Sequence, residues 1–287
     1  MFEHAERRGL HILPVHYYSP IPDLQHLKLD DQTPRFIAAT PQVLDSATKE
    51  LADLVDCYGE AFTGIRARPR YAEADEITEF RFGIAPYSTV EAEALYGLIR
   101  QKQPARIIEI GCGHTTLLIS EAIRAEYDIG YSPDYICIDP YRPTYLKKPP
   151  REVSRFMDTS LQSVPLDLFC ALRAGDVLFI DSSHVVSYGS DTVYELTSIL
   201  PELHAGVLVH IHDIFLPYEY PTEWLRNSRF FWNEQYMLAT LLRDNPRYKI
   251  YWPLHQLYRE RHDALLGLFP LLSDATQRPG AYWIEVM

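Results

Sequence analysis

The sequence contains no long apolar run. None of its segments approaches the roughly 20 consecutive apolar residues that span a bilayer. The first residues also lack the apolar core of a secretory signal. Its four cysteines (Cys57, Cys112, Cys137 and Cys170) are widely spaced and form no Cys-x-x-Cys pair. Reduced thiols in a cytoplasmic protein are therefore expected, without membrane contact, a disulfide framework or a cysteine zinc site.

Positive charge is scarce as well. The 287 residues include 27 Lys and Arg against 39 Asp and Glu, a net charge of −12. Nucleic-acid binding depends on basic side chains that neutralise phosphates, so this balance argues against a nucleic-acid partner. The apolar content of 47% supports a substantial core. The length allows one large domain with an extension, and no internal repeat is visible.

The most informative stretch is an apolar run from Ile107 to Ile110, followed by Gly111 and Gly113. Beyond Thr116, apolar residues recur at helical spacing, which predicts a buried strand, a tight glycine turn and a helix. Glycines at such a turn reach unusual backbone angles and leave room for a ligand. The helix start adds free N–H groups and partial positive charge. Together these features predict a cradle for a nucleotide-like cofactor.

Two cofactors compete for this cradle. A dinucleotide fingerprint has the form Gly-x-Gly-x-x-Gly after a strand, but Thr116 occupies the third glycine position. The other pattern has an acidic residue two positions before the glycine pair, which Glu109 supplies. A carboxylate there can accept hydrogen bonds from a cationic amino-acid head group. The pattern favours an amino-acid-bearing nucleoside over NAD.

Further strands and helices alternate along the chain. Such alternation predicts a Rossmann-like α/β fold, a mostly parallel sheet with helices on both faces. Strands are expected at 107–110, 135–138, 153–157, 176–180, 206–211, 248–252 and 281–286, the last two as an antiparallel pair. Helices are expected at 41–62, from 88 to before Pro104, after Thr115, around 193–200 and at 231–243. Residues 1–85 form an N-terminal arm and helical extension, with an extended arm to about residue 40 and an irregular linker at 63–85.

The run Glu109-Ile-Gly111-Cys-Gly113 resembles the first motif of class I S-adenosylmethionine (SAM)-dependent methyltransferases. The resemblance covers roughly residues 86–287 and implies a seven-stranded sheet with SAM as cofactor. Glu109, Gly111 and Gly113 would then contact it. Asp139 ends the second strand, 26 residues beyond Gly113, near the offset at which an acid meets ribose hydroxyls. In this architecture Asp158, at the end of the third strand, would lie near the adenine.

A polar cluster follows the fourth and fifth strands: Asp181-Ser-Ser-His184 and His210-Ile-His212-Asp213. Neighbouring strands of a doubly wound sheet bring these ends together. By the period of two, His210 and His212 share a face of the strand. His210 is deeper, and we interpret it as a hydrogen-bonded core histidine. His184 is the first candidate for a general base and His212 the second, with Asp181 beside both and near the cofactor.

The cluster has a narrower resemblance, to metal-dependent small-molecule O-methyltransferases such as those acting on macrolide sugars. The likeness implies Asp181 and Asp213 as metal ligands and His184 as base. His212 departs from that pattern, which has a second acid there. Because Mg²⁺ prefers oxygen ligands, a histidine at position 212 implies one of two things. Either the site binds no metal, or it prefers Mn, Fe or Zn. The sequence does not decide between these alternatives, and Asp181, His212 and Asp213 are the candidate metal ligands. A His-x-His strand end also occurs in amidohydrolases, but there it opens a barrel near the N-terminus.

Residues from about 214 to 245 interrupt the alternation with prolines and aromatic side chains. This insertion follows the fifth strand and is expected to lie over the ligand edge as a lid. Tyr220, Trp232 and Glu234 are the candidate contacts with the substrate. The same aromatic residues suit packing onto the core or a homo-oligomer interface.

The sequence thus predicts SAM-dependent methyl transfer to a small-molecule acceptor, at oxygen rather than nitrogen, with metal assistance (Mg, Mn or Fe) left open. An NAD-dependent oxidoreductase is the alternative enzyme. A non-catalytic SAM-binding scaffold subunit is the alternative of another class. It would bind the cofactor without turnover, and the polar cluster argues against it.

Overall fold

The computed structural model describes residues 2–13, 15–16, 18–68, 77–82, 87–273 and 278–287. A seven-stranded sheet in the order β3-β2-β1-β4-β5-β7-β6 forms its centre. The five strands from β3 to β5 are parallel, and β7 is antiparallel to both β5 and β6. This is the Rossmann-like sheet that the sequence predicts. The strands are β1 (Arg106–Ile110), β2 (Asp134–Ile138), β3 (Arg155–Met157), β4 (Val177–Ile180), β5 (Leu208–Ile211), β6 (Tyr248–Pro253) and β7 (Tyr282–Val286).

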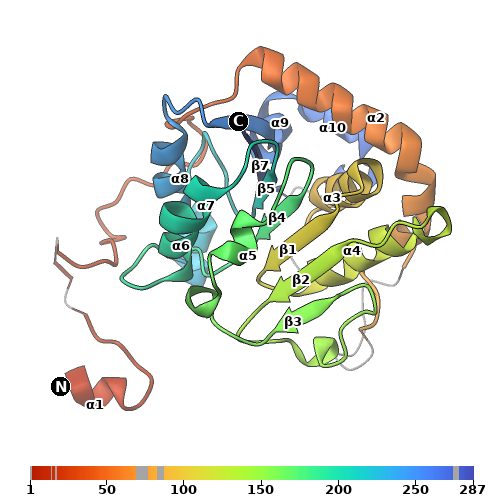
Figure 1. Ribbon diagram of the computed structural model, residues 1–287. Helices are drawn as coiled ribbons and strands as arrows, with labels where there is room; N and C mark the ends of the chain where they lie inside the picture. Colours follow the sequence, from red (N-terminus) through yellow and green to blue (C-terminus); the bar gives the residue numbers. More distant parts are fainter. Residues whose placement is uncertain (1, 14, 17, 69–76, 83–86, 274–277) are drawn as a thin grey trace.

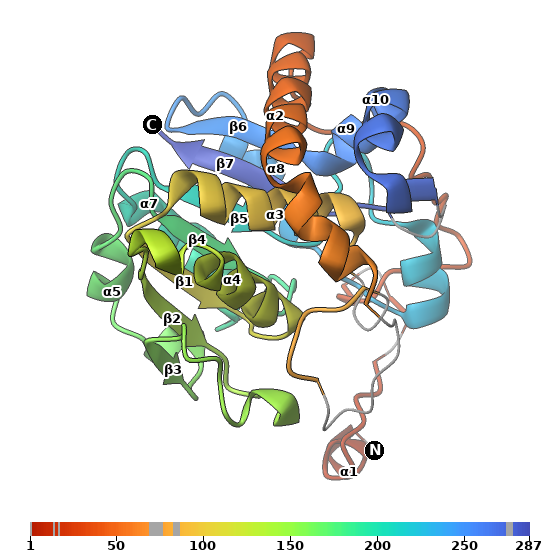
Figure 2. The ribbon, with the colours of Figure 1, turned by 90° about the vertical axis from the view of Figure 1, so that its right-hand side faces the viewer.

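Helices cover both faces of the sheet (Figures 1 and 2). One face carries α2, α3 and α4, and Figure 2 shows α3 and α4 in front of the strands. The other carries α5 to α8. The first set is α2 (Pro41–Arg66), α3 (Thr89–Lys102) and α4 (His114–Arg124). The second is α5 (Asp167–Cys170), α6 (Asp191–Tyr194), the π-helical turn η5 (Glu195–Ile199), α7 (Leu200–Glu202) and α8 (Glu234–Leu242). Each face buries its own apolar cluster, so the central strands have two buried faces.

Sequence signals set the helix ends that lead into the site. Ser88 caps α3, and its side chain and that of Glu91 form a reciprocal capping box. Helix α2 extends four residues beyond the predicted Phe62. Helix α8 begins at Glu234, three residues after the predicted start. Of the predicted linker, residues 63–66 are helical, while 69–76 and 83–86 lie outside the described residues.

The N-terminal arm contains one short helix, α1 (Phe2–Glu6), and little other regular structure. Figure 1 shows its first part projecting away from the sheet. Its second part lies against the insertion that follows β5: the N–H groups of Arg35 and Phe36 both donate to the Pro217 carbonyl. The Asp31 carboxylate accepts from the Thr222 N–H. Residues 30–36 therefore brace the insertion that follows β5.

Short elements complete the chain. Two helices that the sequence analysis did not predict, α9 (Leu254–Glu260) and α10 (His262–Leu268), lie between β6 and β7. The remaining turns are η2 (Tyr127–Ile129), η3 (Thr144–Leu146), η4 (Leu161–Ser163), η6 (Trp224–Ser228) and η7 (Pro270–Ser273). Within the described residues, no helix is long and apolar enough to cross a membrane.

Candidate active site

The glycine turn connects β1 to α4 at the carboxyl edge of the sheet. Gly111 has φ +77°, in the left-handed region. A Cβ atom there would lie 1.8 Å from the carbonyl oxygen of Asp181. Only glycine therefore allows the turn to pass this close to the end of β4. Gly113 precedes His114, where α4 begins.

Glu109 does not face the ligand side of this turn, which corrects our expectation of a direct cofactor contact. Its side chain is fully buried and accepts hydrogen bonds from the hydroxyls of Thr115 (2.6 Å), Thr116 (2.8 Å) and Tyr135. Burial raises the pKa of Glu109 to about 7 against the effect of these donors. The carboxyl group thus supports the turn from within the core.

A cavity of about 500 Å³ lies at the ends of β1 and β2. Asp139 lines it, and its carboxylate accepts from the backbone N–H groups of Cys112 (2.8 Å) and Tyr141 (2.6 Å). Asp158 does not line this cavity, contrary to its predicted place beside the adenine. Its carboxylate is paired with Nε and Nη2 of Arg142, both at 2.6 Å. Instead the wall is formed by the segment that follows, Ser160 to Gln162.

A second cavity of about 270 Å³ adjoins the first, because both are lined by Gly111, Asp139 and Asp181. Its other walls come from the glycine turn and from the strand-end cluster. It is lined by Tyr87, Gly111, Cys112, Gly113, His114, Thr115, Asp139, Tyr145, Asp181, His212 and Asp213. The structure therefore brings Asp181, His212 and Asp213 to the glycine turn, although up to about 100 residues separate them in the chain.

Asp181, His212 and Asp213 each offer one ligand atom, and these atoms lie within 4.8 Å of one another. The register of β4 and β5 places them: the N–H of His212 donates to Ile180, the residue before Asp181. Burial raises the pKa of Asp213 to about 6 despite the nearby histidines. Burial lowers the pKa of His212, but Asp213 and Asp181 outweigh it, so the net shift is upward. The arrangement can hold a proton or a cation at the cavity wall.

His184, the first candidate for the base, lies behind these carboxylates and is not among the residues that line the cavity. Its Nε2 is 3.3 Å from Asp181 Oδ1 and 3.5 Å from Asp213 Oδ2. Its Nδ1 is 2.9 Å from Glu234 Oε2. Burial opposes a charged ring, yet the Asp181 and Glu234 carboxylates prevail and raise the pKa of His184 well above its usual range.

His210 is the buried core histidine that its position on the strand predicts. Its ring stacks on Phe179 at 4.1 Å and meets the edge of Trp283 at 4.8 Å. The hydrogen bonds that we expected for it are not found, because neither ring nitrogen has a partner among the described residues. Burial lowers the pKa of His210 well below its usual range, so the ring is neutral.

The three predicted substrate residues of the lid are engaged within the protein. Tyr220 is buried, and its hydroxyl accepts from the Gln235 N–H at 3.1 Å. The ring of Trp232 lies 4.3 Å from that of His184. Glu234 is bound to His184 as described. Trp232 and Glu234 therefore contact the candidate site, whereas Tyr220 packs within the insertion.

Tyr87, His114 and Tyr145 line the second cavity and were not predicted. The Tyr145 hydroxyl lies 3.2 Å from His114 Nδ1. The Tyr87 hydroxyl is buried and has no hydrogen-bond partner among the described residues. The centre of the Tyr87 ring lies 5.2 Å from that of the His212 ring. The one available signal for Tyr87 was its place directly before the Ser88 cap, which no rule connects to a ligand.

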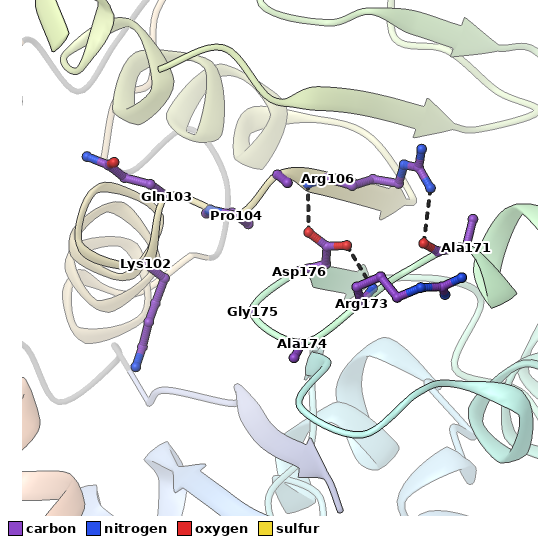
Figure 3. A pocket seen from close by; sticks show the side chains of 10 residues that line it. Lys102, Gln103, Pro104, Arg106, Ala171, Arg173, Ala174, Gly175 and Asp176 are labelled. Atoms are coloured by element: carbon purple, nitrogen blue, oxygen red, sulfur yellow. Dashed lines mark hydrogen bonds between the residues drawn. The ribbon is translucent and has the colours of Figure 1, made fainter. Parts of the chain in front are cut away.

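A further cavity of about 420 Å³ opens at the opposite edge of the sheet, where β1 and β4 begin (Figure 3). Asp176 accepts there from the N–H groups of Arg106 and Arg173, and the Arg106 guanidinium donates to Ala171. These bonds hold the loop before β4. Open α/β sheets bind ligands at the carboxyl ends of their strands, so the glycine-turn edge is the candidate site.

Part of the chain matches a known family, and solved structures of low identity are similar to it. Residues 108–214 match a family model described as a methyltransferase domain. Among solved structures, the SAH-bound methyltransferase PaMTH1 of Podospora anserina is 13% identical with a TM-score of 0.42, covering 89% of this chain and 100% of that chain. The Mg-SAM form of CmcI is 13% identical with a TM-score of 0.40, covering 79% and 95%. No curated protein matches the sequence significantly.

The matched region runs from β1 through β5 and so includes the glycine turn, Asp139 and the strand-end cluster. Strands β7 and β6 follow the matched region in the chain and complete the seven-stranded sheet, with β7 next to β5. The region that matches a methyltransferase domain therefore contains the motif that resembles class I SAM-dependent methyltransferases.

Proposed function

We propose that this methyltransferase transfers the methyl group of SAM to an oxygen atom of a small-molecule acceptor. The observation that carries the proposal is that Asp181, His212 and Asp213 line the same cavity as the glycine turn. A hydroxyl acceptor must lose its proton as it attacks, whereas a neutral amine is already nucleophilic. Two carboxylates and an imidazole beside the cofactor turn supply groups suited to taking that proton.

The cofactor contacts that we assign are Gly111, Gly113, Asp139 and Asp181, with Glu109 as internal support. Both oxygens of Asp139 already accept an N–H group, which fixes the carboxylate while leaving lone pairs for ribose hydroxyls. Asp181 lines both cavities, where the nucleoside and methionine ends of SAM would meet. We keep no role for Asp158 in the site.

We assign the proton transfer to His212 rather than to His184. His212 lines the cavity, and the Asp181 and Asp213 carboxylates stabilise the imidazolium that forms. The acceptor O–H proton moves to His212 as the oxygen forms a bond to the methyl carbon. The carbon–sulfur bond breaks, and its electron pair returns to sulfur to give S-adenosylhomocysteine. Alignment of oxygen, carbon and sulfur is the main contribution required of the protein.

The same three residues fit a divalent metal. Two carboxylates and an imidazole converge at the cavity wall, a donor set better suited to Mn²⁺ or Fe²⁺ than to Mg²⁺. A metal ion held there would supply Lewis-acid activation of the acceptor oxygen. With a metal bound, His212 is a ligand and not a base, so chelation separates the two forms of the proposal.

The test combines binding with turnover. Calorimetry should show S-adenosylhomocysteine binding and no NAD binding. Labelled methyl groups from SAM should then pass to members of a panel of phenols, glycosides and hydroxylated macrocycles. Asp181→Ala should abolish transfer, whereas Asp128→Asn, a change at an exposed acid distant in the chain, should leave it intact.

Each outcome has a defined meaning. Loss of transfer in EDTA with recovery on added Mn²⁺ supports the metal form, and full activity in EDTA supports His212 as base. NAD binding would point to an oxidoreductase. Cofactor binding without transfer to any acceptor would leave a scaffold subunit as the better explanation.

A further inference from the structure

The loop after β4 holds His184 in a conformation that a non-glycine residue rarely adopts. Its φ is +59°, in the left-handed region, where a Cβ atom is unfavourable. Such a conformation persists where surrounding contacts determine it. Here the contacts come from the start of helix α8 in the lid: the N–H groups of Asn233 and Glu234 reach the His184 carbonyl at 3.1 and 3.3 Å.

Side chains of the same two lid residues complete the connection. Asn233 Oδ1 accepts from the Val186 N–H at 2.6 Å, so the loop is bound on both sides of Val185. Glu234 is 1% exposed, and its Oε2 lies 2.9 Å from His184 Nδ1. Because the neighbouring carboxylates hold the pKa of His184 well above its usual range, both ring nitrogens carry a proton, and Nδ1–H donates to Glu234.

With Nδ1 bound to Glu234, the other ring nitrogen has a fixed direction. Nε2 points between Asp181 Oδ1 at 3.3 Å and Asp213 Oδ2 at 3.5 Å. Trp232 covers the ring at 4.3 Å. His184 thereby sits between the two carboxylates that line the cavity, whose negative charges would otherwise repel each other.

We propose that Glu234 is a positioning residue, through which the lid helix α8 orients His184 and so sets the places of Asp181 and Asp213 at the cavity wall. The inference rests on the proposed function and assigns Glu234 a role different from substrate contact. In this role the lid, residues from about 214 to 245, helps to orient the residues at the cavity wall. Loss of Glu234 should therefore slow methyl transfer without weakening cofactor binding, which depends on the glycine turn.

The variant that tests this is Glu234→Leu, which keeps the approximate size but removes the acceptor, with Glu234→Gln as the conservative form. Partners that orient a functional side chain typically contribute roughly 10- to 100-fold. We expect kcat to fall by that factor in Glu234→Leu and by less in Glu234→Gln. The affinity for S-adenosylhomocysteine should stay within about threefold of the wild-type value.

The matched control is Glu223→Gln, in the same lid. Glu223 is exposed and paired with Arg278 at 3.2 Å, away from the cluster. It should change neither kcat nor KM for the acceptor. A second readout needs no acceptor: ¹⁵N-labelled histidine spectra should show a downfield Nδ1–H proton of His184 in the wild-type protein. That signal should disappear in Glu234→Leu and persist in Glu223→Gln.

The outcomes separate the positioning role from the proposed function. Unchanged kcat in Glu234→Leu, or no such proton in the wild-type spectrum, overturns the role of Glu234. A fall in cofactor affinity and thermal stability together with kcat would show a general folding defect, and also overturns it. A wild-type protein that shows the proton and binds the cofactor but methylates nothing overturns the proposed function itself.

Discussion

Gly111→Ala should push the glycine turn and the end of β4 apart, because the two backbone segments are in close contact at this residue. The new Cβ would start 1.8 Å from the Asp181 carbonyl oxygen, a backbone atom that cannot rotate away as a side chain does. To reach ordinary van der Waals separation of 3.4 Å, the carbonyl would have to retreat by about 1.6 Å. The strand-end hydrogen bond from the Asp181 N–H to Ile110, at 2.9 Å, opposes that movement.

The cost has two parts that can be measured apart. Left-handed backbone costs a non-glycine residue about 1–2 kcal/mol. Overpacking typically adds about 1–3 kcal/mol, so Gly111→Ala should lose about 2–5 kcal/mol of unfolding free energy. Gly130 is the matched control because its φ is +81° and nothing lies within 4 Å of the point that a Cβ atom would occupy. Gly130→Ala should lose only the backbone part.

Urea unfolding of both variants measures this difference, and calorimetry with S-adenosylhomocysteine measures its effect on the site. Because Asp181 lines both cavities, Gly111→Ala should also lose most of its cofactor affinity, while Gly130→Ala keeps it. Equal stabilities for the two variants, or wild-type affinity in Gly111→Ala, would refute the close approach as the reason for glycine.

Two further predictions concern buried polar groups. Tyr87→Phe removes a hydroxyl with no partner among the described residues, so the free energy of unfolding should stay constant. The affinity for cofactor or acceptor should fall about 5- to 10-fold. Tyr188→Phe, which changes a fully exposed ring, is the control. Equal affinity in Tyr87→Phe would remove it from the site. The pKa of Glu109 is about 7 in the folded protein, compared with its ordinary value of 4.5. Protonation of Glu109 therefore stabilises the fold fully below pH 4.5, and this stabilisation is lost as the pH rises towards 7. Denaturant titrations should show an advantage of up to about 3 kcal/mol disappearing over this range in the wild-type protein but not in Glu109→Gln, and parallel curves would contradict the assignment.

The sequence by itself determined the fold. All seven strands occur where apolar runs predicted them, and the glycine pair marked the cofactor turn. These signals are local: an apolar run, a cap or a glycine acts through its own neighbours in the chain. The alternation of strand and helix then left few possible topologies. The short helices α1, α5, α9 and α10 were not predicted. Helices α9 and α10 have only seven residues each, too few for apolar spacing to stand out from the flanking sequence.

Only the tertiary structure decided which way the site residues face. Glu109 lies on a central parallel strand whose two faces are both buried, so alternation of polar and apolar residues carries no signal about its direction. The bond between His184 and Glu234 joins residues 50 positions apart. It depends on how the lid helix docks, which apolar packing sets and no local pattern records. Sequence thus placed the chemical groups at one edge of the sheet, and long-range packing decided that His212 faces the cavity while His184 stands behind it.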